Sequence, residues 1–196
     1  MKSCILISSL LIFNFCCFGQ STKEQKFKST VKEIITAFSK QDTAAVAKYI
    51  DKKIGVYQID RIGLYEHYNN FHMISFSDTT YPQVLFSYSK GVKLLPLKYA
   101  TLPTWDCDKS AWSKEGLFVD TTKTDHMLTE MCKDRNNNFY NNIPAKTMKF
   151  FYKLENLSRR IVLDDHNGTE LVFYLTYLNG NWYLTIIDDA TSDCSV

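Results

Sequence analysis

The sequence predicts an α+β domain in which N-terminal helices pack on a curved antiparallel sheet. A helical apolar stripe begins at Phe27, and two apolar strands near the C-terminus are joined by Asn179-Gly180, a strong hairpin signal. The first helical patterns precede this strand-rich end, an order that is typical of α+β folds. Because 45% of the residues are hydrophobic and 14% are aromatic, the chain has enough apolar surface for a core, which excludes a disordered protein.

The start of the chain is predicted to be a secretory signal peptide. Lys2 provides a positive charge, and the apolar run from Ile5 to Phe18 is shorter than the roughly 20 residues that a membrane-spanning helix needs. Small residues stand at Cys17 and Gly19, before the polar sequence that begins at Gln20. We therefore expect a signal peptide over 1–19, a single domain over 20–196 and no transmembrane span.

Cys16 and Cys17 offer an alternative in which the exported chain carries a lipid anchor. A bacterial lipidation site has a small residue directly before the modified cysteine, and Phe15 fits that requirement poorly. The sequence therefore favours export to the periplasm or the extracellular space without a lipid over anchoring at Cys16 or Cys17.

Three cysteines remain in the domain, so one disulfide with three possible pairings can form. Cys107 and Cys194 lie in polar segments, whereas Cys132 shares a helical apolar stripe with Leu128 and Met131 and is expected to be a buried thiol. Export permits disulfides. We therefore predict a bond between Cys107 and Cys194. The cysteines are widely spaced, so no metal site and no cofactor are expected.

The N-terminal part of the domain is predicted to be helical, with one strand after it. Apolar residues recur at helical spacing from Phe27 to Phe38. Asp42 is expected to cap a second, short helix that carries Val46 and Ile50. A strand is predicted over 54–59.

The middle of the chain has weaker patterns. Short strands are predicted over 84–88, 97–102 and 117–119. A helix is expected to begin near Thr124 and to end near Asn136, and another is expected from Pro144 to about Leu157, because proline suits the first position of a helix.

The C-terminal segment is predicted to form three strands, over 160–163, 171–178 and 181–188. The Asn179-Gly180 turn sets a register in which residue 177 lies opposite 182, 175 opposite 184 and 173 opposite 186. The core face of this hairpin is then expected to carry Leu171, Phe173, Leu175, Tyr177, Trp182, Leu184 and Ile186.

Two parts of the sequence resemble the NTF2-like superfamily, also called the cystatin-like cone. The resemblance lies in the helix pair with Lys40-Gln-Asp-Thr43 and Ala47-Lys-Tyr-Ile50, and in the closing hairpin with Asn179-Gly-Asn-Trp-Tyr-Leu184. It covers roughly residues 27–60 and 160–196, and the segment 64–142 departs from the pattern. Enzymes of this family carry Asp/His or Tyr/Asp pairs inside the cone, but no motif places such a pair here.

The tail from Ile187 to Ser195 resembles the ends of uncharacterised exported proteins of Bacteroidota-type bacteria. Within this tail, Asp188 and Asp189 are the candidate catalytic residues. In a cone, one of these carboxylates would lie at the rim of the pocket, where burial would raise its pKa and make it a general base. The alternative is a solvated strand end.

Trp105 and Trp112 are the candidate ligand-binding residues. Exposed aromatic rings offer a large contact area for a sugar or a peptide at low entropic cost. The alternative is that these rings form a second small core under the long loops of the middle segment.

The function expected from these observations is that of an exported, non-catalytic binding or interaction domain. Its partner would be a small molecule or an envelope protein; a formal net charge of +2 gives no indication of nucleic-acid binding. One alternative is a small-molecule isomerase or hydrolase that uses a carboxylate in the cone. Another is a structural component of the cell envelope.

Overall fold

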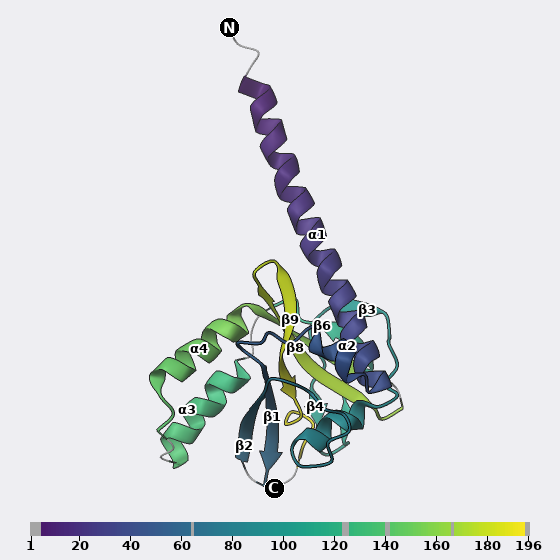
Figure 1. Cartoon of the computed structure of the whole chain (residues 1–196), viewed down its shortest axis with the longest axis vertical. Coiled ribbons are helices and arrows are strands. Elements are labelled where there is room, and N and C mark those ends of the chain that lie inside the picture. Colours follow the sequence, from purple (N-terminus) through teal and green to yellow (C-terminus); the bar gives the residue numbers. More distant parts are fainter. Residues whose placement is uncertain (1–4, 64, 123–125, 140–141, 166, 195–196) are drawn as a thin grey trace.

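The computed structural model describes residues 5–63, 65–122, 126–139, 142–165 and 167–194, with only the backbone described for residues 5–21. Helices cover both faces of a central sheet (Figure 1). The helical elements are α1 Ile5–Lys40, α2 Thr43–Ala47, the 3₁₀ helix η1 Gln83–Ser89, α3 Met127–Phe139 and α4 Ala145–Asn156. The strands are β1 Val56–Ile62, β2 Tyr65–Phe71, β3 Leu97–Tyr99, β4 Trp105–Asp106, β5 Ala111–Trp112, β6 Gly116–Val119, β7 Ser158–Asp164, β8 Glu170–Leu178 and β9 Asn181–Asp188.

The strands form one large sheet in the order β2-β1-β9-β8-β7-β6-β3, and β4 and β5 form a separate hairpin. β1 lies parallel to β9 and β3 lies parallel to β6, whereas the other neighbours are antiparallel. The predicted α+β class is therefore confirmed, but the sheet is mostly, not entirely, antiparallel. Local patterns reveal hairpins, whereas a parallel pair joins strands that are distant in the sequence.

The apolar stripe of α1 packs on one face of the sheet, as predicted. The ring of Phe27 lies 4.9 Å from that of Trp182 on β9, measured between centroids. Asp42 caps α2 by accepting a hydrogen bond from the backbone N–H of Ala45 at 2.9 Å. The buried side chains that α1 contributes to this core are Phe27, Val31, Ile34, Ile35, Ala37 and Phe38.

The β8–β9 hairpin has the predicted turn and most of the predicted register. Asn179 and Gly180 have φ angles of 49° and 84°, as a type I′ turn requires. Tyr177 lies opposite Trp182 and Leu175 opposite Leu184, but Phe173 lies opposite Ile187. A β-bulge places one extra residue in β9, so Ile186 lies on the other face of the sheet and its predicted position on this core face is wrong.

The second face of the sheet is covered by α3 and α4. Both helices were predicted, and Phe151, Leu154 and Leu128 are buried there against Ile59 and other residues of the sheet. Glu155 of α4 accepts hydrogen bonds from the backbone N–H groups of Leu128 and Thr129 in the first turn of α3, at 2.7 and 3.3 Å. This carboxylate therefore joins the two helices.

Two expectations for the middle of the chain are wrong. The segment 84–88 is not a strand but part of η1, in which Phe86 and Ser89 are buried three residues apart, as the threefold period of a 3₁₀ helix requires. The predicted strand 97–102 is shorter, because β3 ends at Tyr99. β2 was not predicted, since its polar sequence has no strand pattern and its pairing with β1 determines its conformation.

For the N-terminal expectations, the structure describes only the backbone of most of the residues concerned. Residues 1–4 are not described, and side chains are described only from Thr22 onward, so the signal peptide over 1–19 and a lipid at Cys16 or Cys17 remain predictions. The backbone of α1 extends from Ile5 to Lys40, and its second half packs on the sheet (Figure 1). In the described residues, no helix combines the length and the hydrophobicity that spanning a bilayer requires.

Candidate functional site

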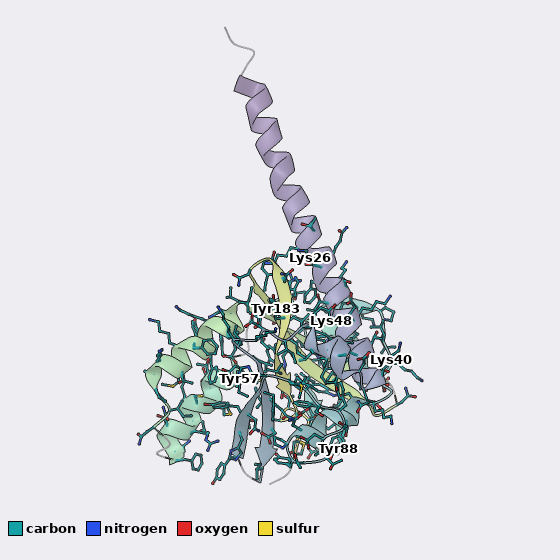
Figure 2. All side chains as sticks on the ribbon, in the orientation of Figure 1. Lys26, Lys40, Lys48, Tyr57, Tyr88 and Tyr183 are labelled. Atoms are coloured by element: carbon teal, nitrogen blue, oxygen red, sulfur yellow. A yellow bond between two sulfur atoms is a disulfide. The ribbon has the colours of Figure 1, made fainter. Side chains whose placement is uncertain are left out.

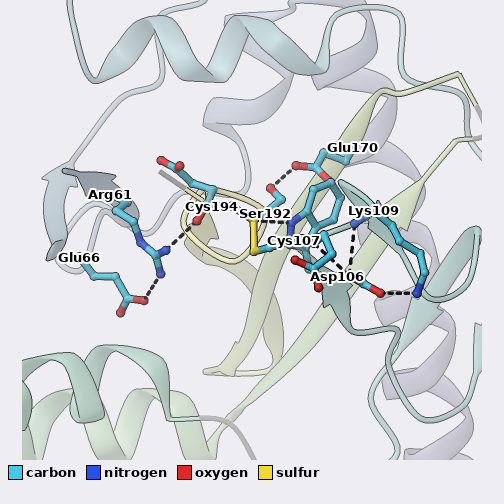
Figure 3. The surroundings of a disulfide bond; sticks show 11 residues. Arg61, Glu66, Asp106, Cys107, Lys109, Glu170, Ser192 and Cys194 are labelled. Atoms are coloured by element: carbon cyan, nitrogen blue, oxygen red, sulfur yellow. Dashed lines mark hydrogen bonds and ion pairs between the residues drawn. A yellow bond between two sulfur atoms is a disulfide. The ribbon is translucent and has the colours of Figure 1, made fainter. Parts of the chain in front are cut away.

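The disulfide joins Cys107 to Cys194, as the loop contexts predicted. The two Cα atoms are 5.7 Å apart, and the residues are separated by 87 positions in the sequence. Closing a loop of this length restricts the unfolded chain and stabilises a fold by roughly 4–5 kcal/mol in the chain-entropy model. The bond ties the C-terminal tail to the β4–β5 hairpin (Figure 3).

Trp105 and Trp112 face each other across this hairpin. They are cross-strand partners, and their ring centroids are 5.4 Å apart with an interplanar angle of 72°. The indole N–H of Trp105 donates to Cys194 Sγ at 3.0 Å, and that of Trp112 donates to a carboxylate oxygen of Glu170. Each ring is thus held in place by a residue that is far away in the sequence.

These two rings line a cleft of about 470 Å³ where β7 ends and β8 begins. Its position beside Tyr88 puts it at the end of the domain remote from Lys26 on α1 (Figure 2). We call it the tryptophan cleft and define it by Tyr88, Trp105, Trp112, Glu115, Asp164 and Glu170; Ser110, Ala111 and Gly168 complete the lining.

The small-core alternative is confirmed for Trp112, which is 7% exposed, whereas ligand binding by the two rings stays a prediction. Trp112 is buried against Val162 and Val172, with Trp105 and Leu102 packed beside them, so the rings belong to a small core. The same two rings also form walls of the cleft. Because the small core contacts the rings, it holds them in place in the lining of the cleft.

Asp188 proves to be a buried structural residue. Its side chain is fully buried and pairs with Arg160, whose Nη2 lies 2.7 Å from Asp188 Oδ2. It also accepts hydrogen bonds from the backbone N–H groups of Ala190 and Thr191, at 3.2 and 3.0 Å. These contacts turn the chain after β9 and direct the tail toward the disulfide. Asp188 is therefore not a solvated strand end.

Asp189 lies near the opposite face of the sheet from Asp188, in what we call the carboxyl cluster: Gln58, Asp60, Tyr81 and Asp189. Gln58 Nε2 donates to Asp189 Oδ2 at 2.6 Å and to the carbonyl of Pro82 at 3.3 Å. The Tyr81 hydroxyl donates to Asp60 Oδ2. Gln58 is completely buried, and its Oε1 has no hydrogen-bond partner among the described residues.

The environment of Asp189 raises the pKa of its carboxyl group. The residue is partly exposed, but its carboxyl group is enclosed, and this burial is the main reason why its pKa is raised to about 7. The negative charges of Asp188, Asp60 and Glu170 raise the pKa further, and the hydrogen bond from Gln58 opposes them. Asp189 therefore changes its charge near neutral pH.

Most residues around both sites were missed at the sequence level. Asp164 and Glu170 bracket a predicted turn, and neither was singled out as a site residue. The spacing of these residues gives no signal, because the cleft forms only when distant segments meet. Asp60 directly follows the predicted strand 54–59, and no sequence pattern indicates that it lies near Asp189.

The chain was also compared with known proteins. No family model, curated protein or solved structure matches it.

Proposed function

We propose that this chain is an exported, non-catalytic binding domain that holds its ligand in the tryptophan cleft. The observation that carries the proposal is the pair of tryptophans fixed from behind by a small core and from the side by Cys194 and Glu170. Binding sites are concave, aromatic and preformed, with a few polar groups that orient the ligand. A cleft of about 470 Å³ lies within the usual size range for such sites.

The proposal of export rests on the signal sequence and on the disulfide. Disulfides persist in oxidising compartments and are rare in the cytosol of ordinary bacteria. The Cys107–Cys194 bond is part of the site itself, since Cys194 accepts the hydrogen bond from Trp105. A protein that matured in a reducing compartment would lack this support for the ring.

We also propose that the domain is an NTF2-like cone. The two segments that carry the resemblance, 27–60 and 160–196, come together in this fold, because β1 lies parallel to β9. The helix pair α1–α2 covers one face of the sheet that they form. On the other face, α3 comes from the segment 64–142 that departs from the family pattern, and α4 lies between that segment and the second segment that carries the resemblance.

A ligand-library screen tests the binding function. The protein is exposed to a library of small polar and aromatic compounds, and binding is measured as a rise in melting temperature. Tyr88→Ala removes a 69% exposed ring of the cleft, and Tyr152→Ala removes a 51% exposed ring on α4 as a matched control. We expect compounds whose stabilisation is lost in Tyr88→Ala and kept in Tyr152→Ala. Loss in neither variant, or no stabilising compound at all, would contradict the proposal.

A second candidate function is acid–base catalysis by the carboxyl cluster. A carboxyl group with a pKa of about 7 beside another carboxylate and a tyrosine is typical of a general acid or base. This candidate corresponds to the isomerase or hydrolase alternative. Its test is turnover of a panel of chromogenic esters and enolisable ketones: activity in the protein that disappears in Asp189→Asn would support it, and inactivity of both forms would exclude it for these substrates.

A further inference from the structure

We propose that the solvent-exposed face of α4 docks the domain on an anionic lipid bilayer. No residue of α4 lines the tryptophan cleft, so this docking surface is separate from the proposed ligand site. Three features of α4 support a lipid partner: lysines without counter-charges, exposed apolar side chains between them, and a position beside the entry of α1 into the domain.

Five residues share one exposed face of α4 and of the residue that follows it. They stand at relative positions 0, 3, 4, 7 and 11, and helix residues at these intervals lie on one side of the helix. Phe151 and Leu154, at other positions of the helix, are buried against the sheet. We call the exposed set the α4 surface: Lys146, Lys149, Phe150, Lys153 and Leu157.

The three lysines of the α4 surface are not neutralised by the domain itself. Within the part of the chain that the structure describes, none of them forms an ion pair with a carboxylate. The acidic residue of α4, Glu155, is buried and accepts hydrogen bonds from α3. Like charges three and four residues apart repel each other on a helix. An anionic surface would relieve this repulsion.

The neighbouring helix does not supply the missing negative charge. Two acidic and two basic side chains of α3 balance each other, and Glu130 already pairs with Lys133 at 2.7 Å. The positive charge of α4 therefore faces solvent, where it attracts an anionic partner.

Apolar side chains stand between these lysines. Phe150 is 37% exposed and Leu157 is 50% exposed. Helices that lie at a bilayer interface combine lysines, which contact the headgroups, with phenylalanine and leucine, which enter the acyl boundary. The phosphates of a nucleic acid would neutralise the lysines but leave Leu157 in water. The combination therefore favours a lipid surface over a nucleic acid.

The α4 surface ends close to the place where α1 enters the domain. The carbonyl of Leu157 accepts a hydrogen bond from the N–H of Tyr177 at 3.3 Å, and Lys23 Nζ of α1 lies 4.0 Å from the centroid of the Tyr177 ring. Figure 1 shows the end of α4 beside the β8–β9 hairpin, on the side from which α1 projects. Cys17 precedes Lys23 by six residues. A lipid at Cys16 or Cys17 would therefore hold the α4 surface near the bilayer.

Vesicle flotation tests the charge dependence of docking. The full-length protein is mixed with vesicles of phosphatidylcholine alone or of equal parts phosphatidylcholine and phosphatidylglycerol. We expect at least about tenfold more protein to float with the anionic vesicles, and this excess to disappear at high salt. Equal flotation with both vesicles would show that the apolar N-terminal segment alone binds lipid, and would overturn the inference.

Charge variants locate the docking surface. The α4 variant replaces its three lysines: Lys146→Gln, Lys149→Gln and Lys153→Gln. The control removes the same charge beside the helices on the other face of the sheet: Lys32→Gln, Lys40→Gln and Lys90→Gln. Figure 2 shows Lys40 on the opposite side of the domain from α4.

Each lysine near an anionic surface contributes roughly fivefold to binding. We therefore expect the α4 variant to lose its preference for anionic vesicles and the control to keep most of it, with the melting temperatures of both near that of the original. Equal losses would show that the charge of the whole domain, rather than α4, directs binding, and would overturn the inference.

An apolar variant distinguishes a bilayer from another acidic partner. Leu157→Ser should weaken flotation with anionic vesicles several-fold, whereas Leu94→Ser, at a 43% exposed position between η1 and β3, should leave it unchanged. Polyglutamate is the probe for an acidic protein. Binding of polyglutamate that needs the α4 lysines, without flotation on anionic vesicles, would assign the surface to an acidic protein and overturn the inference, while leaving the proposed function of the tryptophan cleft intact.

Discussion

Arg160 and Asp188 form a buried ion pair that holds the C-terminal tail against the sheet. Arg160 Nη2 lies 2.7 Å from Asp188 Oδ2, and the two side chains are 11% and 0% exposed. Arg160 also donates to the hydroxyl of Thr191 at 2.8 Å, and this hydroxyl donates to Asp188 at 2.7 Å. The pair thus fixes the start of the segment that carries Asp189, Ser192 and Cys194 to the two candidate sites.

Loss of this pair is expected to destabilise the whole domain. Asp188→Ala leaves the Arg160 guanidinium buried without its counter-ion, which typically costs about 3–5 kcal/mol of unfolding free energy. Glu130→Ala, which breaks the exposed pair with Lys133, should cost less than about 1 kcal/mol. Urea unfolding of both variants measures the difference. Equal losses would show that the buried pair does not stabilise the tail.

Reduction of the disulfide is expected to weaken the fold and loosen the tryptophan cleft. The double variant Cys107→Ser, Cys194→Ser should lose about 2–5 kcal/mol of stability, and the fluorescence of the protein should change as Trp105 loses its Cys194 partner. Dithiothreitol should reproduce these changes in the original protein and have no further effect on the double variant. If thiol titration of the unreduced, denatured domain finds Cys107 and Cys194 free, the assigned pairing is wrong.

Asp189 is expected to make stability depend on pH. An unfolded aspartate has a pKa of about 3.9, whereas burial raises the pKa of Asp189 to about 7 in the folded state. The folded state binds this proton more tightly, so the contribution of Asp189 to stability falls as the pH rises from about 4 to about 7, and the penalty is complete above 7.

Asp189→Asn removes this penalty because asparagine does not ionise. The stability difference between the variant and the original protein should grow by on the order of 2–4 kcal/mol, in favour of the variant, as the pH rises from about 4 to about 8. Denaturant unfolding at several pH values measures this difference. A constant difference between the two proteins over this range would show that Asp189 is ionised as an ordinary aspartate.

Glu155 is expected to control the stability of the α3–α4 pair. Glu155→Ala leaves the N–H groups of Leu128 and Thr129 without their acceptor in a buried setting, at a cost of about 2–4 kcal/mol. Hydrogen exchange should accelerate most in α3 and α4 and least in β8. Uniform acceleration throughout the domain would mean that these helices do not open as a separate unit.

Local patterns explain why part of the fold could be predicted. The stripe from Phe27 to Phe38 and the Asn179-Gly180 turn are complete within short segments, and both are confirmed. The position of Ile186 was wrong because the bulge in β9 adds a residue that no local pattern reveals. The parallel pairing of β1 with β9 is likewise a contact between distant segments.

The candidate sites were predictable only in fragments. Trp105, Trp112 and Asp189 were singled out by residue type, and the Cys107–Cys194 pairing by the polarity of its surroundings. The partners that give these residues their chemistry, such as Glu170 and Gln58, lie on other strands. Which strand ends meet is decided by the packing of the whole sheet, so the sequence did not show how these residues combine with their partners into the cleft and the carboxyl cluster.

The three tryptophans of the chain provide the most direct test of the proposed binding site. Trp105 and Trp112 line the cleft, whereas Trp182 lies elsewhere, with its indole N–H donated to the carbonyl of Lys23 at 3.1 Å. The compounds that bind in the library screen are titrated while the indole N–H resonances are followed by NMR. We expect the resonances of Trp105 and Trp112 to shift in a saturable manner and that of Trp182 to stay in place. Saturable binding that moves only Trp182, or none of the three, would contradict the assignment of the tryptophan cleft as the binding site.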